Sequence, residues 1–254
     1  MLDRSEIADR GLRIAEYGRD SHPKFAIRNP KSAISRMKLD KLHLIQEESP
    51  RAAAENMAVD EMLFLMAACP VLRVYRWIRP SVSFGYFTPW AEVSSRFTGR
   101  DLIRRWTGGG IVEHGRDFTY SLICPNEKSL PPTIDFYQFV HLAIASILRK
   151  SGYPVEIAHA ADPVESAACF AKAVRFDLKL GGEKIAGAAI RRNRKGLLLQ
   201  GSIQHLELPV QFGLKLAGVL CHRVDSFVLS DLMLEHAARI AKKKYGAAEW
   251  NSRR

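Results

Sequence analysis

The stretch RRWTGGGIVEHGRDFTYS, residues 104–121, is the most distinctive part of the sequence. Two arginines and a threonine precede three consecutive glycines, and His114 leads into the alternating run DFTYSLIC. Glycines lack a Cβ atom, so a ligand can lie against their backbone and accept hydrogen bonds from its N–H groups. The guanidinium forks of Arg104 and Arg105 suit a carboxylate or a phosphate. A glycine-rich turn beside two solvated arginines is the structural alternative. The spacing excludes both a GxGxxG motif and a P-loop.

The whole stretch resembles the signature of the biotin/lipoate protein ligase superfamily, over roughly residues 42–245 of this chain. Members carry an Arg-Arg pair, a Ser or Thr, a glycine run, a Val-x-His and a Tyr-Ser. The matching positions are Arg104, Arg105, Thr107, Gly108, Gly109, Gly110, Val112, His114, Tyr120 and Ser121. The resemblance implies that these residues, except Val112, bind substrate together with Gly187 and Ala188.

Composition is typical of a globular protein with one large domain or two small ones, since 47% of the 254 residues are hydrophobic and 26% charged. No run approaches the ~20 apolar residues that span a bilayer. The charged N-terminus lacks the apolar core of a signal peptide. The four cysteines are widely spaced and form no CxxC pair. This argues against a zinc site or a disulfide scaffold and favours a reducing cytoplasm.

Period-two alternation predicts strands over residues 38–45, two within 72–86 around Pro80, 101–106, 118–124, 153–159, 174–180, 184–189 and 197–204. Helical periodicity predicts helices over residues 51–68, 133–150, 209–218 and 230–244, with Thr133 and Ser230 as caps. The run 118–124 reads as a half-buried strand with Cys124 on its core face. Asn56, Asp60 and Glu61 on the first helix are interpreted as scaffold.

These elements indicate an α+β fold with a mixed or antiparallel sheet and packed helices. The resemblance implies a catalytic domain of the biotin/lipoate ligase type, which is class II aminoacyl-tRNA-synthetase-like. We expect this domain over residues 37–254, without a C-terminal accessory domain. Residues 1–36 are weakly patterned and form an extension, unless Met37 is the true start.

Cys169 and Lys184 form a second constellation, fifteen residues apart, with Lys184 in GEKIAGAAIRR. An unperturbed thiol with a pKa of ~8.5 is mostly protonated at neutral pH, and a nearby ammonium favours the reactive thiolate. The structural alternatives are a buried small cysteine and a solvated turn lysine.

The resemblance separates two branches of the superfamily at this point. ATP-dependent ligases typically carry Arg-Asn-Asp upstream of Lys-x-x-Gly, whereas the octanoyltransferase branch carries Cys-Phe fifteen residues before the lysine. This chain has Cys169-Phe170 and also a Leu-Gln-Gly-Ser-Ile run at 199–203 that is similar to that branch. The resemblance therefore implies an acyltransferase of protein lipoylation. Cys169 would take an octanoyl or lipoyl group from acyl carrier protein as a thioester, and Lys184 would assist.

The same resemblance implies the partners. The acceptor would be a lysine of a lipoyl domain of a 2-oxoacid dehydrogenase or of glycine cleavage H protein, and no cofactor or metal is needed. Such carriers and lipoyl domains are acidic, so a net charge of +11 would speed their encounter.

Two other functions are compatible with the sequence. In an ATP-dependent lipoate or biotin protein ligase, with ATP and magnesium, Arg104, Arg105 and Lys184 would hold the acyl-adenylate. In a non-catalytic basic module, the six basic residues between Arg239 and Arg254 would bind a partner. No nucleic-acid motif accompanies them, and a solvated basic end is the simpler interpretation. Neither a membrane nor a nucleic acid is an expected partner.

Overall fold

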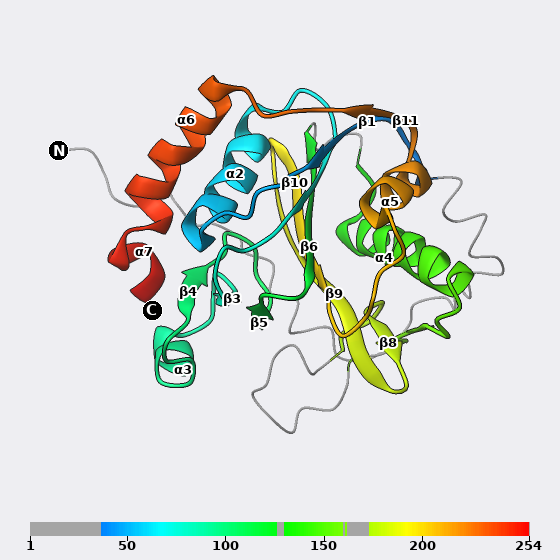
Figure 1. The fold of residues 1–254 in the computed structure, drawn as a ribbon, viewed down its shortest axis with the longest axis horizontal. Coiled ribbons are helices and arrows are strands. Elements are labelled where there is room, and N and C mark those ends of the chain that lie inside the picture. Colours follow the sequence, from blue (N-terminus) through cyan, green and yellow to red (C-terminus); the bar gives the residue numbers. More distant parts are fainter. Residues whose placement is uncertain (1–36, 126–129, 160, 162–172, 254) are drawn as a thin grey trace.

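The computed structural model describes residues 37–125, 130–159, 161 and 173–253, which build two sheets with helices packed on them (Figure 1). The large sheet contains, in spatial order, β11 (Cys221–Ser226), β1 (Leu39–Gln46), β2 (Val71–Tyr75), β6 (Phe118–Pro125), β10 (Gly196–Ile203), β9 (Glu183–Asn193), β8 (Leu178–Leu180) and β7 (Glu156–Ile157). The pairs β11–β1 and β1–β2 are parallel, and the other pairs are antiparallel. This is the mixed α+β architecture predicted from the sequence.

The small sheet and the helices complete the frame. The small sheet has the order β4 (Asp101–Arg104), β3 (Ser81–Phe84) and β5 (Ile111–His114). The helices are α2 (Ala53–Met66), α3 (Trp90–Ser94), α4 (Thr133–Lys150), α5 (Phe212–Leu220), α6 (Asp231–Ile240), a π-helical turn (Ala241–Tyr245) and α7 (Ala248–Ser252). In the described part of the chain, none of these helices is long and apolar enough to cross a bilayer.

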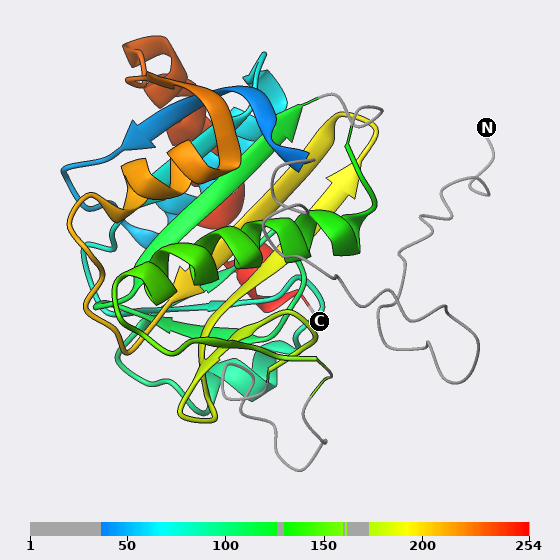
Figure 2. The same cartoon turned by 90° about the vertical axis from the view of Figure 1, so that its right-hand side faces the viewer.

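Helices cover both faces of the large sheet, with α4 and α5 on one face and α2 and α6 on the other (Figures 1 and 2). Strand β6 shows the division, because Leu122 and Cys124 pack with α4 whereas Ile123 packs with α2. Both faces of β6 are therefore buried, and the prediction of a half-buried strand is wrong. The core position of Cys124 is confirmed, and burial raises the pKa of its thiol.

Several element predictions need correction. The strands on either side of Pro80 lie in different sheets and form no hairpin with each other. Strand β8 begins only at Leu178, because Phe176 adopts a left-handed φ of 74° that breaks the extended run. Helix α4 begins at Thr133, but its N-cap is Pro132 and no side chain caps it. The sequence reading missed β5 and β11, whose short or polar runs carry no strong alternation.

The basic C-terminal region is docked on the body of the protein rather than solvated throughout. Lys244 forms an ion pair with Glu61 at 2.6 Å and lies 4.1 Å from the ring centroid of Trp250. The indole Nε1–H of Trp250 donates to the carbonyl oxygen of Arg104 at 2.9 Å. The interpretation of a solvated basic end is therefore wrong for Lys244, and α7 supports the first strand of the signature.

A buried carboxylate joins the first helix to the sheet. Asp60, 1% exposed, receives hydrogen bonds from Arg73 Nη1 at 2.7 Å and from Ser121 Oγ at 2.8 Å. Its second oxygen accepts from Gln200 Nε2 at 2.7 Å and from the Tyr75 hydroxyl at 3.2 Å. Burial disfavours the charged form of Arg73, but the negative charges of Asp60 and Glu47 outweigh this effect and raise the pKa of Arg73 above its usual value. Asp60 therefore has the scaffold role predicted from the sequence, because its buried carboxylate binds side chains from the sheet.

Replacement of Asp60 tests this network. Asp60→Ala leaves the guanidinium of Arg73 buried without one of its two counter-charges, so we expect the free energy of unfolding to fall by about 3–5 kcal/mol in urea denaturation. The matched control is Asp225→Ala, which removes a one-third exposed carboxylate paired with Lys41. That variant should unfold close to the wild-type midpoint. Equal stability of both variants would contradict the proposed weight of the network.

Candidate active site

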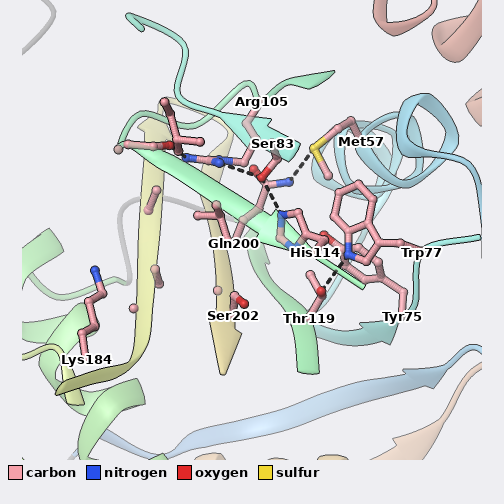
Figure 3. A pocket seen from close by; sticks show the side chains of 18 residues that line it. Met57, Tyr75, Trp77, Ser83, Arg105, His114, Thr119, Lys184, Gln200 and Ser202 are labelled. Atoms are coloured by element: carbon pink, nitrogen blue, oxygen red, sulfur yellow. Dashed lines mark hydrogen bonds between the residues drawn. The ribbon is translucent and has the colours of Figure 1, made fainter. Parts of the chain in front are cut away.

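A cavity that is open to solvent lies between the glycine loop (residues 108–110) and strands β9 and β10 (Figure 3). In Figure 3, Lys184 lies at one end of the lining and the aromatic group of Tyr75, Trp77 and His114 at the other. The lining residues are Met57, Tyr75, Trp77, Ser83, Arg105, Gly109, Gly110, Ile111, Val112, His114, Thr119, Lys184, Gly187, Ala188, Ala189, Gln200, Gly201 and Ser202.

The glycine loop packs directly against the end of β3. A Cβ atom on Gly85 would lie 1.9 Å from the carbonyl oxygen of Gly109, so only glycine fits there. Gly109 itself adopts a left-handed φ of 80°. The guanidinium Nη2 of Arg105 donates to the carbonyl oxygens of Gly108 at 3.0 Å and Gly110 at 2.7 Å. Arg105 therefore holds the loop in shape at the edge of the cavity.

A hydrogen-bonded chain fixes Arg105 from behind. Its Nη1 donates to Ser83 Oγ at 2.7 Å, and Ser83 Oγ lies 2.6 Å from His114 Nε2. His114 Nδ1 lies 2.8 Å from Asp117 Oδ2, and the indole of Trp77 stacks on the imidazole with ring centroids 4.1 Å apart. Burial opposes ionisation of Asp117, yet the charge and hydrogen bond of His114, with further hydrogen bonds, lower the pKa of Asp117 to about 2.

A second chain connects the loop to the buried network. Thr107 Oγ1 donates to Gln200 Oε1 at 2.7 Å, and Gln200 Nε2 donates to Asp60 Oδ2 at 2.7 Å. Gln200 lies on β10 and lines the cavity together with Gly201 and Ser202. The position of the glycine loop is therefore coupled to the buried ion pair of Asp60 and Arg73.

The lysine of the second constellation is held by a buried carboxylate. Lys184 Nζ lies 2.8 Å from Asp177 Oδ2, and the Lys184 side chain is only 10% exposed. Asp177 is fully buried and also accepts a hydrogen bond from the Tyr137 hydroxyl through Oδ1. Burial excludes the alternative of a solvated turn lysine. The arrangement places a positive charge at one end of a cavity lined mainly by apolar and small residues.

The cavity brings together seven of the predicted site residues, which are Arg105, Gly109, Gly110, His114, Lys184, Gly187 and Ala188. Within the described chain, five predicted residues do not line it: Arg104, Thr107, Gly108, Tyr120 and Ser121. Cys169 lies outside the described residues.

The five have structural contacts instead. The guanidinium of Arg104 donates to the carbonyl oxygens of Thr88 at 2.7 Å and Asn251 at 2.9 Å. The ring of Tyr120 packs under Gly201, where a Cβ atom would lie 2.3 Å from it. The hydroxyl groups of Thr107 and Ser121 donate to the buried network, and the carbonyl oxygen of Gly108 accepts a hydrogen bond from Arg105. These contacts support the cavity wall, and a direct part of the five residues in binding substrate stays a prediction.

Sequence reasoning missed Asp177, Tyr137, Ser83, Trp77 and Gln200. Asp177 carried a signal, because it is a charged residue seven positions before the predicted activator Lys184. Ser83 and Trp77 lie in short strand-like segments where serine and tryptophan are unremarkable. Among the described residues, no group of three or more His, Cys, Asp and Glu side chains is placed to hold a metal ion.

Comparisons with known proteins show the family to which this chain is similar. The model of the lipoyl protein ligase A/B catalytic domain matches residues 52–206. An octanoyltransferase LipM of Exiguobacterium is 33% identical over 183 residues, which cover 63% of this chain and 64% of that protein. An octanoyltransferase LipM of Symbiobacterium thermophilum is 34% identical over 181 residues, covering 65% of this chain and 66% of that protein. The chain thus spans just under two thirds of the length of these curated relatives.

Solved structures share the fold at lower sequence identity. A candidate lipoate protein ligase from T. acidophilum with bound lipoic acid gives a TM-score of 0.65 at 21% identity, over 84% of this chain and 98% of that chain. Lipoate-protein ligase A bound with ATP gives 0.63 at 23% identity, again over 84% and 98%. The fold implied by the resemblance is confirmed. Because the matched segment exceeds half of the chain and contains the glycine loop, His114 and Lys184, this protein belongs to the lipoyl protein ligase A/B catalytic domain family.

Proposed function

We propose that this protein is an acyltransferase of protein lipoylation, which moves an octanoyl group from acyl carrier protein to a lysine of an acceptor protein. The observation that carries the proposal is the ammonium of Lys184, held by Asp177 at the end of an apolar-lined cavity that the glycine loop also borders. The proposal is supported by 33–34% identity to relatives named octanoyltransferases.

The reaction has two transfers that balance without a further reagent. The thiolate of Cys169 attacks the thioester carbonyl of octanoyl-acyl carrier protein, the C–S bond to the carrier breaks, and the carrier leaves as its thiolate. A lysine amine of the acceptor then attacks the octanoyl-Cys169 thioester, forms an amide and returns the cysteine sulfur as thiolate. The proton that the amine loses balances the charge of the carrier thiolate, which becomes a thiol. Division of one difficult transfer into two is covalent catalysis.

The described residues supply binding and electrostatic stabilisation. The ammonium of Lys184 favours the thiolate and the oxyanion that develops at the carbonyl. We expect the acyl chain to lie against the apolar lining, to which Met57, Ile111 and Ala189 contribute. The N–H of Ala188 is already donated to the Tyr137 hydroxyl at 3.1 Å, so the glycine loop is the better source of further oxyanion donors.

The acceptor we propose is a lipoyl domain of a 2-oxoacid dehydrogenase or glycine cleavage H protein, and the reaction runs without a cofactor in a reducing cytoplasm. The ATP-dependent ligase is the alternative outcome. It would activate free lipoate with ATP and magnesium, with Arg105 and Lys184 beside the adenylate. Arg104 is a poor candidate for that role, because its guanidinium is bound to backbone carbonyl oxygens away from the cavity.

One prediction concerns the sulfur atom of Cys169, to which the octanoyl group would be attached. After incubation with octanoyl-acyl carrier protein and no ATP, intact-mass spectrometry should show one octanoyl group on the wild type, released by hydroxylamine as expected for a thioester. Cys169→Ser should show none. The matched control is Cys69→Ser, which changes a half-buried free thiol outside the cavity and should acylate as the wild type does. If acylated acceptor forms only when ATP and free lipoate are supplied, the proposal is wrong and the protein is a ligase.

Another prediction concerns the ammonium group of Lys184. Lys184→Met keeps the length of the side chain and removes its charge, so transfer of octanoyl to a lipoyl domain should slow by about 10²–10³-fold in single-turnover assays. Lys215→Met, on the exposed side of α5, is the control and should retain the wild-type rate. A wild-type rate in Lys184→Met would remove the lysine from the mechanism.

A further inference from the structure

We propose that Asp177, Tyr137 and Gly187 are positioning residues, which together fix the ammonium of Lys184 at one place at the end of the cavity. Here the three residues are called the lysine clamp. Its kinetic consequence rests on the proposed acyl transfer, whereas its geometry does not.

The carboxylate of Asp177 is itself immobilised. Its Oδ2 accepts from Lys184 Nζ at 2.8 Å and from the backbone N–H of Val174 at 2.7 Å. Its Oδ1 accepts from the Tyr137 hydroxyl, and the side chain has no exposed surface. With both oxygens bound, Asp177 presents a fixed negative charge to the lysine. A buried charge of this kind is stabilising only when its partners stay in place.

Tyr137 holds the carboxylate from α4. Its hydroxyl accepts the N–H of Ala188 at 3.1 Å and donates to Asp177, so it links β9 to the clamp. Burial and then the charge of Asp177 raise the pKa of Tyr137 well above its usual value, which keeps the hydroxyl a donor. The imidazole of His141 stacks on the ring with centroids 4.2 Å apart, and burial lowers the pKa of His141. A neutral His141 does not compete with Lys184 for the negative charge of Asp177.

Gly187 provides the space that the lysine occupies. A Cβ atom at this position would lie 2.6 Å from Lys184 Cε, 2.8 Å from Lys184 Nζ and 3.2 Å from Asp177 Oδ1. The lysine side chain therefore crosses directly over the backbone three residues further along the same strand. Any side chain at residue 187 pushes the ammonium out of the clamp. This explains why the spacing Lys-x-x-Gly suits the site physically.

The turn between β8 and β9 brings the parts together. Residues 179 and 184 are cross-strand partners, so Asp177 at the entry to β8 lies near Lys184, the second residue of β9. Lysine is a point charge on a flexible four-carbon stem, and without a fixed partner it samples many positions. A displacement of about 1 Å in a reacting assembly can cost up to ~10²-fold in rate.

A double-mutant cycle in acyl transfer tests the clamp. Asp177→Asn should lower kcat by about 10- to 100-fold with little change in the KM for the acceptor, because Asp177 is buried and contacts Lys184 rather than the acceptor. In the Lys184→Met background the same change should cause no further loss, since a positioning residue acts only through the group it positions. Losses that multiply in the double variant, or a wild-type kcat in Asp177→Asn, would overturn the proposal.

Two milder variants guard against loss of folding. Gly187→Ala should lower kcat as Asp177→Asn does, whereas Gly218→Ala, at an exposed helical position with no atom within 4 Å, should not. Tyr137→Phe removes one hydroxyl and should lower kcat, whereas Tyr153→Phe, whose hydroxyl bonds a surface carbonyl, should not. Unchanged kcat in both Gly187→Ala and Tyr137→Phe, with circular dichroism showing folded protein, would also overturn the clamp.

A stability measurement separates failure of the clamp from failure of the proposed function. If the wild type transfers no octanoyl group, the proposed function fails, and the same cycle is run on urea midpoints. Non-additive midpoints for Asp177→Asn and Lys184→Met would still support the clamp, and additive ones would overturn it.

Discussion

The buried carboxylate of Asp60 is the interaction on which the rest of the structure depends. It is bound by side chains from β2, β6 and β10, and it lies on the helix that covers one face of the large sheet. Through Gln200 the same carboxylate reaches Thr107, immediately before the glycine loop. Core packing and site geometry are therefore one connected system. A change in the angle between α2 and the sheet would move the loop that borders the cavity.

The two cations at the cavity are fixed by different physical means. Arg105 donates to neutral acceptors, which are the carbonyl oxygens of Gly108 and Gly110 and the hydroxyl of Ser83. Lys184 is held by a carboxylate, which fixes its position and partly offsets its field. A planar guanidinium suits several fixed acceptors, and a compact ammonium suits one carboxylate. The cavity thus has a loop braced by a guanidinium on one side and an ammonium held by a carboxylate on the other.

The sequence predicted the parts of this structure that depend on local pattern. Alternation over residues 118–124 placed Cys124 in the core, and helical periodicity located α2 and α4. It could not show that both faces of β6 are covered, because the second layer comes from α2, more than fifty residues earlier. Adjacent arginines in the motif looked equivalent, yet Arg104 bonds Asn251 while Arg105 bonds the loop. The partner of Lys184 was missed because only the turn between β8 and β9 brings Asp177 near it.

The pairing of β1 with β11 joins residues 39–44 to residues 221–226 in one parallel ladder. Contacts this distant along the chain close large loops and slow folding. During synthesis, the first strand of the sheet must wait for β11, and the carbonyl of Arg104 must wait for Trp250, before either gains these partners. The nascent chain therefore leaves this edge of β1 unpaired until residues 221–226 have been synthesised.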